Sequence, residues 1–244
     1  MRVILLTIFL ISSTLCFSQN NKGVAIYTVK TNYAFNEIDK VEQKEVLKRI
    51  FEESGKESSI NFKLIFNNEK SVFFAEKALN RNDNKVDLVS IKAKILGKIF
   101  VNLETKEIIQ HKEKFGETFN INSSLNEHEW ILTKEQLKIG KYSCYKAILK
   151  SKKDKKSETI AWYAPELASR VGPLGYCGLP GLVIILKDDI FIYSLKEIIF
   201  NLPKQDDKTI HRPKTGMEVS IKEYDSIYKI MREKKDKLER ESYN

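Results

Sequence analysis

The chain has 244 residues, of which 42% are hydrophobic and 31% are charged, and its formal net charge at pH 7 is +9. This composition excludes an intrinsically disordered chain, and the length fits one domain or at most two. Three cysteines are too few for a disulfide-rich scaffold, and the sequence has no apolar run of about 18 residues that would predict a membrane-spanning helix.

The first residues have the pattern of a cleaved export signal. Arg2 gives a positive start, residues 3–11 form a short apolar run, and Ser18 is a small residue directly before the cleavage point. We therefore expect residues 1–18 to be removed. Residues 19–244 then form a single exported domain, located in the periplasm or outside the cell.

Cys16 offers an alternative to this cleavage. In a lipoprotein signal it would become the lipidated first residue and anchor the protein to the outer membrane. Leu15 argues against this, because a lipoprotein signal normally has Gly, Ala or Ser directly before the cysteine. Export without a lipid is therefore the preferred prediction.

The mature chain begins with a predicted strand and a predicted helix. Residues 23–33 are β-branched and aromatic and alternate in part, which indicates a strand. Residues 36–54 are rich in Glu and Lys, with Glu45 and Arg49 spaced for an i,i+4 pair, and Gly55 follows as a stop. This pattern predicts a surface helix inserted early in the domain.

From residue 58 onward, short apolar segments are separated by Asn- and Gly-rich breaks that are typical of hairpin turns. Strands are predicted over 60–66, 71–76, 86–95, 98–103, 107–111, 117–121, 141–150, 158–163, 182–186 and 190–200. Short strands at this spacing favour a mostly antiparallel sheet over βαβ units.

Two capping-box patterns predict further helical segments. Thr133 and Gln136, flanked by Leu132 and Leu137, indicate a single helical turn. The second box begins the C-terminal helix described next.

Ser220 and Glu223 form this second box and start a helix over 220–240, after a linker loop at 201–216 that contains two prolines. The apolar face of the helix is expected to dock on the sheet and consists of Ile221, Tyr224, Tyr228, Met231 and Leu238. Together the elements predict an α+β fold. Its core is a curved, mostly antiparallel, half-barrel-like sheet with one inserted helix and one C-terminal helix.

A loop with four glycines and two prolines in ten residues occupies positions 172–181. It lacks the GxGxxG and GxxxxGK[ST] patterns of phosphate-binding loops. Because proline restricts φ and glycine permits positive φ, the composition indicates a loop of fixed shape that leads into a buried strand. We expect Leu179 and Leu182 to be buried and at least one of Gly178 and Gly181 to have positive φ. A ligand- or partner-binding rim is the alternative.

The loop and its flanks resemble the GLPGLI family. Residues 178–183 (GLPGLV) are similar to the family's hallmark, with Val183 in place of isoleucine, and residues 172–173 resemble the Gly-Pro that precedes it. Residues 141–147 (KYSCYKA) resemble the family's Gly-Tyr-x-Cys-x-Lys-Ala strand, and residues 161–165 (AWYAP) its Ala-Trp-Tyr-x-Pro segment. The structural positions of the motif in this chain are Gly172, Pro173, Gly178, Leu179, Pro180, Gly181 and Leu182.

The chain departs from the family pattern at two positions. Lys141 replaces the glycine of the first segment, and Cys177 replaces the aromatic residue before the hallmark. The family consists of exported Bacteroidota proteins without an established activity. The resemblance therefore implies export but no particular reaction.

An architectural likeness to the half-barrels of envelope lipoprotein carriers would place an apolar concavity on the sheet. Trp162 and Tyr163 are adjacent on a predicted strand and therefore face opposite sides of it. Together with Tyr176 and Leu179, they are the candidate residues for binding a hydrophobic ligand or a protein partner.

Cys144 and Cys177 are the cysteines that remain after export. In an oxidising compartment they can form a disulfide, which would stabilise the fold by about 3–4 kcal/mol on the chain-entropy model. Two separately buried thiols are the alternative.

No pattern in the sequence predicts a catalytic group, a cofactor or a metal site. His111, His128 and His211 lie on separate segments without an i,i+4 partner and are expected to be solvated. No base can be placed beside Cys177, which argues against a nucleophile. The positive charge is spread evenly, so nucleic-acid binding is not expected. Peripheral contact with an anionic membrane surface is the alternative to a simply solvated surface.

These observations favour a non-enzymatic protein of the cell envelope that binds a hydrophobic ligand or an envelope protein partner through a curved sheet. The alternatives are a hydrolase with unrecognised catalytic carboxylates and a structural partner of an outer-membrane assembly. The concave face of the sheet distinguishes them. An apolar cavity favours a carrier, convergent carboxylates favour an enzyme, and a filled core favours a protein-partner role.

Overall fold

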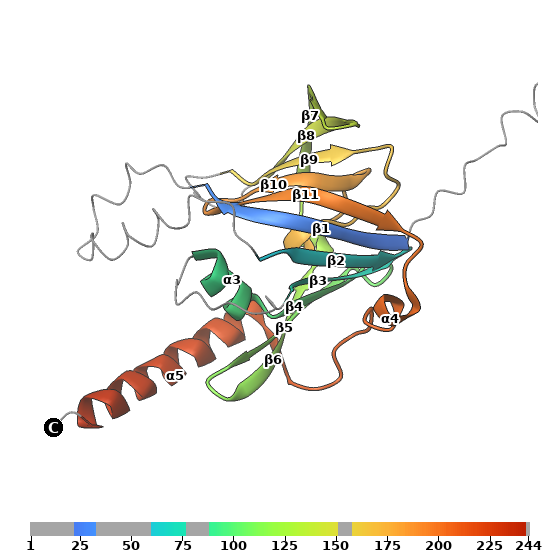
Figure 1. Cartoon of the computed structure of the whole chain (residues 1–244). Helices are drawn as coiled ribbons and strands as arrows, with labels where there is room; N and C mark the ends of the chain where they lie inside the picture. Colours follow the sequence, from blue (N-terminus) through green and yellow to red (C-terminus); the bar gives the residue numbers. More distant parts are fainter. Residues whose placement is uncertain (1–21, 33–59, 77–87, 151–157, 243–244) are drawn as a thin grey trace, which may run out of the picture.

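The computed structural model describes residues 22–32, 60–76, 88–150 and 158–242. These residues form one open, curved, mostly antiparallel sheet of twelve strands, together with three helices (Figure 1). The α+β fold with a curved sheet is therefore as the sequence predicts. The predicted signal at 1–18 and the predicted helix at 36–54 lie outside the described residues.

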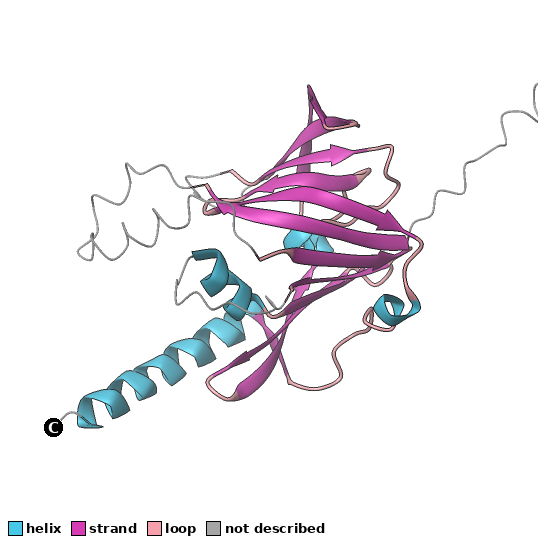
Figure 2. Cartoon of the chain, in the orientation of Figure 1, coloured by secondary structure: helices cyan, strands magenta, loops and turns pink. Residues whose placement is uncertain are grey.

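The secondary-structure elements follow one another along the whole described chain (Figure 2). The strands are β1 (Lys22–Thr31), β2 (Phe62–Asn67), β3 (Lys70–Ala75), β4 (Lys98–Asn102), β5 (Glu107–Lys114), β6 (Glu117–Ser124), β7 (Trp130–Ile139), β8 (Tyr142–Leu149), β9 (Ile160–Ala164), β10 (Leu182–Lys187), β11 (Phe191–Phe200) and β12 (Met217–Ser220). The helices are α3 (Leu88–Leu96), α4 (Lys204–Asp207) and α5 (Ile221–Ser242), and two 3-10 turns are η2 (Leu125–Glu127) and η3 (Pro173–Gly175).

The first strand lies in the middle of the sheet. The strand order is β12-β6-β5-β4-β3-β2-β1-β11-β10-β9-β8-β7, so β1 joins the β2–β6 half to the β7–β11 half. All neighbours are antiparallel except β12 and β6, which are parallel. The two ends of the sheet are therefore β12 and β7.

The predicted hairpin break at residues 67–68 coincides with an observed turn, whereas the predicted break at Gly97 is the end of α3, and that at 80–84 lies outside the described residues. Between β5 and β6, Phe115 and Gly116 have φ of 54° and 80°. Two consecutive positive φ values match the right-handed twist of the strands that the turn connects. Asn68, between β2 and β3, also has positive φ, at 40°. These turns explain why consecutive strands pair as neighbours.

The prediction of a strand over 86–95 is wrong, because Leu88–Leu96 form α3. Val89 and Leu96 are buried on the side of the helix that packs against the sheet. Gly97, with a φ of 66°, ends the helix in the left-handed conformation that favours glycine. The β-branched composition favours a strand locally, but burial of one helical face against the sheet overrides that preference.

The prediction of a helical turn at 132–137 is also wrong, because this segment belongs to β7. Thr133 still makes a local cap-like bond, since its Oγ1 accepts a hydrogen bond from the backbone N–H of Glu135 at 3.2 Å. The same Oγ1 donates to the carbonyl oxygen of Lys146 on β8 at 3.1 Å. The pairing of β7 with β8 shifts register here. The segment that carries the capping pattern therefore forms a bulge within the strand and not a helical turn.

The predicted C-terminal helix is confirmed as α5. The backbone N–H of Ser220 donates to Glu223 Oε2 at 2.7 Å, and the backbone N–H of Glu223 donates to Ser220 Oγ at 3.3 Å. This is the reciprocal capping box that the sequence predicts. No helix in the described part of the chain is long and apolar enough to cross a membrane.

Only the first turns of α5 dock on the sheet. The ring of Tyr224 meets that of Phe119 on β6 edge to face, with centroids 5.3 Å apart, and Tyr228 and Met231 pack on the same cluster. Ile221 and Leu238, which were also expected on this face, are 46% and 58% exposed, so the prediction is wrong for these two residues. The helix is longer than the sheet edge that it covers, so its C-terminal part extends away from the sheet (Figure 1).

The predicted linker at 201–216 contains more structure than expected. It includes α4, which is tied to β2 by an ion pair between Lys63 Nζ and Asp206 at 3.2 Å. Ile210 is buried in a cluster with Val24 and Ile65. The chain then forms β12, a short parallel strand that the sequence analysis missed.

Candidate functional site

The loop between β9 and β10 is a fixed part of the fold. Leu179 and Leu182 are 1% and 0% exposed, as expected from the loop composition. Gly178 has a φ of 93°, the left-handed conformation expected of one glycine. Gly181 has a different role, because a Cβ at this position would collide with the carbonyl oxygen of Ala164. These glycines set the path of the chain and supply no chemical group.

The same loop, which starts after β9, also packs against strands of the other half of the sheet. The turn η3 contacts β3 and β4, and a Cβ on Gly175 would lie 3.1 Å from the side chain of Ile99 and 3.2 Å from that of Ile108. Loop and strand side chains form one buried cluster that includes Leu167, Val171, Cys177 and Leu179 with Tyr27, Phe62, Phe73 and Tyr193. The concave side of the sheet is therefore filled by the protein itself.

Trp130, at the start of β7, anchors the loop from outside. Its Nε1 donates a 3.0 Å hydrogen bond to the carbonyl oxygen of Cys177. The ring of Tyr176 meets the Trp130 ring edge to face at 6.0 Å and lies 5.0 Å from the ring of His128. Burial raises the pKa of Tyr176. Trp130 was not among the predicted binding residues, because its contact with the loop joins segments that are far apart in the chain.

The four candidate binding residues do not converge on one cavity. Leu179 is in the core, and Tyr163 is buried with its ring 6.1 Å from that of Tyr145 on β8. Trp162 is half-buried on the adjacent position of β9, and Tyr176 packs against Trp130. Each of the four is therefore used by the fold.

The predicted disulfide is not present, since Cys144 and Cys177 are both free and buried. The Cys144 thiol donates to the carbonyl oxygen of Tyr142 at 3.8 Å, and the Cys177 thiol donates to that of Gly175 at 3.0 Å. Burial raises the pKa of Cys144 to about 11 and that of Cys177 to about 12. Each thiol thus has its own local acceptor, and neither carries the thiolate needed for nucleophilic chemistry.

The histidines do not share a site. His111 Nδ1 lies 2.7 Å from Asn120 Oδ1, and His128 packs on Tyr176, so the expectation that both are solvated is wrong. The folded sheet supplies partners that are distant in sequence. His211 is exposed. Among the described residues, no group of three or more His, Cys, Asp or Glu side chains is placed to hold a metal ion.

The most distinctive opening in the sheet lies between β10 and β11. Only three residue pairs join these strands, from Ile185 with Ser194 to Lys187 with Ile192. The rest of β11, residues 195–200, pairs with β1 on one side. The opposite edge of residues 195–200 pairs with no strand in the described part of the chain, and we call it the open edge.

A bend in β10 produces the open edge. Between Val183 and Ile185 the pairing of β10 with β9 shifts by one residue. An extra residue of this kind bends a strand and strengthens its twist. The hydroxyl of Tyr27 on β1 donates a 2.6 Å hydrogen bond to the carbonyl oxygen of Val183, although β11 lies between the two strands. β10 is therefore held away from β11 at this point.

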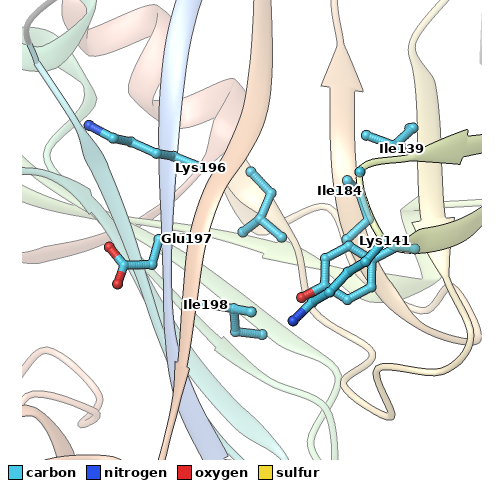
Figure 3. A pocket seen from close by; sticks show the side chains of 9 residues that line it. Ile139, Lys141, Ile184, Lys196, Glu197 and Ile198 are labelled. Atoms are coloured by element: carbon cyan, nitrogen blue, oxygen red, sulfur yellow. The ribbon is translucent and has the colours of Figure 1, made fainter.

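A pocket of about 390 Å³ lies where the two strands separate (Figure 3). It is bounded by the β7–β8 turn, by β10 and by the open edge, and its lining residues are Ile139, Gly140, Lys141, Tyr142, Ile184, Leu195, Lys196, Glu197 and Ile198. Figure 3 shows Ile184 and Ile198 beside Lys141, whereas Lys196 and Glu197 point away from this group. The pocket thus has an apolar floor with one ammonium group over it.

This arrangement is suited to binding. A volume of this size falls within the roughly 300–1,000 Å³ of ligand sites, which are mostly apolar with a few polar groups. The open edge adds a row of backbone groups that a ligand strand can pair with. No local sequence pattern predicts this site, because the pocket depends on the register of β10 against both of its neighbouring strands.

One family model matches part of the chain. It is described as a protein of unknown function (Porph_ging) and matches residues 149–185. This segment contains β9, the loop that fills the concave side, and most of β10. No curated protein matches the sequence.

Solved structures of PNGF-II are similar in fold. The structure in the C2 space group has a TM-score of 0.50 at 17% identity and covers 81% of this chain and 31% of that chain. The structure in the P21 space group has a TM-score of 0.55 at 18% identity and covers 86% and 33%. The chain therefore spans about a third of the length of PNGF-II, and the likeness concerns the fold alone.

Proposed function

We propose that the protein is a non-enzymatic binding protein of the cell envelope, and that it binds an extended segment of a partner protein at the open edge of β11. The observation that carries this proposal is the position of an unpaired strand edge directly beside an apolar pocket. A strand added to an exposed edge gains affinity from main-chain hydrogen bonds and specificity from pockets for alternate side chains.

The open edge has the properties of an interaction strand. Ile199 and Phe200 are 44% and 40% exposed, although most large apolar side chains in the sheet are buried. An exposed apolar edge strand is a template for pairing with another chain. Lys196 and Glu197 are also exposed, and they offer one charge of each sign to a partner strand.

A peptide fits this site better than a lipid or another purely apolar ligand. The concave side, where a carrier would hold an acyl chain, is filled by Leu167, Val171 and Leu179 of the loop. An apolar ligand would use the pocket floor and leave the backbone of the open edge unpaired. An extended peptide uses both.

The comparison with PNGF-II supports a modular role. There the same fold makes up about a third of a longer chain. Domains of a longer chain commonly meet at interfaces that resemble transient protein–protein interfaces. We extend this to the present chain by analogy of fold alone.

Export belongs to the same proposal. The apolar run at 3–11 and Ser18 at the cleavage point support removal of residues 1–18 and a location outside the cytoplasm. The GLPGLI-like motif at 178–183 supports membership of that exported family, and the family-model match covers the same segment. The intact mass of the mature protein tests the cleavage: a diacylglyceryl adduct on Cys16 would contradict it.

The binding proposal is tested with peptides. A random dodecapeptide library panned on the purified protein is expected to enrich sequences with alternating apolar residues. Fluorescence anisotropy then measures binding of one enriched peptide, which should weaken at least tenfold in Ile139→Ser and in Ile198→Ser. Ile230→Ser, on the exposed part of α5, is the matched control and should bind like the wild type.

Two further measurements complete the test. The melting temperature of each variant distinguishes loss of binding from loss of folding. N-methylation at alternate peptide positions should abolish binding, because it removes the donors that pair with the open edge. If no peptide is enriched, and oleate binds the wild type but not Ile198→Ser, the site is a hydrophobic-ligand pocket and the peptide proposal is wrong.

A further inference from the structure

A second cleft lies in the other half of the molecule, between α3, β5 and α5. Its volume is about 560 Å³, and it is lined by Lys92, Lys94, Ile95, Leu96, Gln110, Lys112, Glu113, Lys114, Tyr224, Asp225 and Tyr228. Gln110 Nε2 donates a 2.8 Å hydrogen bond to the carbonyl oxygen of Leu96, which fixes the end of α3 to β5. The docked first turns of α5 form the third wall. The cleft is therefore built from elements that are held together.

Two lysines of this cleft have their ammonium groups over aromatic rings. Lys112 Nζ lies 4.2 Å from the centre of the Tyr224 ring, and Lys114 Nζ lies 5.8 Å from that of Tyr228. Cation–π contacts of this kind orient an ammonium group without neutralising its charge. The amines therefore keep their positive charge available to a ligand.

Positive charge in the cleft exceeds negative charge. Four lysines and two carboxylates, Glu113 and Asp225, line it, which leaves a net charge of two positive. Within the described residues, no ion pair joins any of the four lysines to a carboxylate.

The amines also repel one another. Burial lowers the pKa of Lys112, and the nearby charges of Lys114 and Lys92 lower it further, against the opposing effect of Asp225. Burial also lowers the pKa of Lys92, against the opposing charge of Asp188. An anion in the cleft would relieve this repulsion.

We infer that this cleft binds a phosphate group, either free or as a phosphate monoester. A phosphate monoester carries about −1.5 to −2 charges at pH 7, which matches the net charge of the lining. A carboxylate carries only one charge and would leave part of the lysine charge unpaired. The half-buried ring of Tyr228 provides a surface for the remainder of an ester. This inference does not rest on the peptide proposal, since it uses different strands.

Calorimetric titration of the full chain tests the inference with three probes. These are inorganic phosphate, glucose 6-phosphate and vesicles that contain phosphatidic acid, whose headgroup is a phosphate monoester, with phosphatidylcholine vesicles of zero net charge as the control. Binding of the first two identifies a soluble phosphate ligand. Binding of the phosphatidic acid vesicles alone identifies a lipid headgroup. Either result supports the inference.

Variants separate the cleft from general attraction to a basic protein. Lys112→Gln should weaken binding at least tenfold, and Lys114→Gln, on the same strand face, is the second variant in case the first unfolds. Lys138→Gln on β7 removes the same charge from an exposed position and should leave the dissociation constant unchanged. If none of the probes binds, or if Lys138→Gln weakens binding as much as the cleft variants, the inference is wrong.

Discussion

The hydroxyl of Tyr27 donates a 2.6 Å hydrogen bond to the carbonyl oxygen of Val183, 156 positions later in the chain. Both residues are fully buried. Because β11 lies between β1 and β10, the bond spans a whole strand and fastens β10 where its pairing shifts. This contact links the first strand to the segment matched by the family model and fixes the separation of β10 from β11.

Replacing Tyr27 by phenylalanine should destabilise the protein by about 1–3 kcal/mol, because the buried carbonyl of Val183 loses its donor. The urea unfolding midpoint measures this change. Tyr193→Phe is the matched control, since the Tyr193 hydroxyl is buried in the same cluster without a hydrogen-bond partner in the described residues. It should leave the midpoint unchanged or raise it. Equal losses in both variants would show that the Val183 bond is not the cause.

Gly181→Val should lower the unfolding midpoint by more than the ~1 kcal/mol typical of single substitutions, because its Cβ would collide with the Ala164 carbonyl. Gly178→Ala should cost roughly 1–2 kcal/mol, since its φ of 93° is strained for any residue with a Cβ but the space around it is open. Thermal unfolding measures both. If Gly181→Val keeps the wild-type midpoint but abolishes peptide binding, the loop is a recognition site.

Protonation of Glu218 should cause part of the loss of stability of the folded protein in acid. Hydrogen bonds from Asn122, Arg212 and Asn120 lower its pKa, with that from Asn122 the largest. A carboxyl with a lowered folded-state pKa adds stability above its unfolded pKa of about 4.3, and that stability is lost as the pH falls through the folded value. Glu218→Gln should therefore show a smaller fall in melting temperature between pH 6 and about pH 3.

Glu117→Gln is the control for this comparison, because Glu117 is exposed at the start of β6. It should keep the pH dependence of the wild type. A Glu218→Gln variant that loses as much stability in acid as the wild type would exclude this carboxylate as a source of the effect.

The two thiols should react only after unfolding. Cys144 and Cys177 are buried, and burial raises their pKa to about 11 and about 12, so little thiolate is present at pH 8. Intact mass after iodoacetamide treatment should show no adduct on the native protein and two on the denatured, unreduced protein. Absence of adducts on the denatured protein would reveal a disulfide and contradict the structure.

The sequence predicts local features of this fold better than long-range ones. The capping box at Ser220 and the hairpin turn at Asn68 depend on residues close in the chain, and both are confirmed. The segment 86–95 was expected to be a strand from its composition, but residues 88–96 form a helix because packing against the sheet determines their conformation. Gly97 was the available signal, since a glycine that follows a helix commonly ends it.

The candidate site was less predictable than the fold. Burial of Leu179 follows from the loop composition, but the fate of Tyr163 and Tyr176 depends on partners such as Tyr145 and Trp130 on other strands. The pocket at Ile198 arises because β10 bends away from β11. That bend is set by pairing with β9 and by Tyr27, and neither can be read from a local pattern.

Hydrogen exchange at the open edge tests the central claim most directly. Backbone amides of residues 195–200 should exchange quickly where they face the unpaired side of β11, and mass spectrometry measures their rates with and without a bound, library-selected peptide. The account predicts at least tenfold slower exchange in this segment on binding, with little change in β2–β6. Saturating peptide binding that leaves exchange at 195–200 unchanged would contradict it.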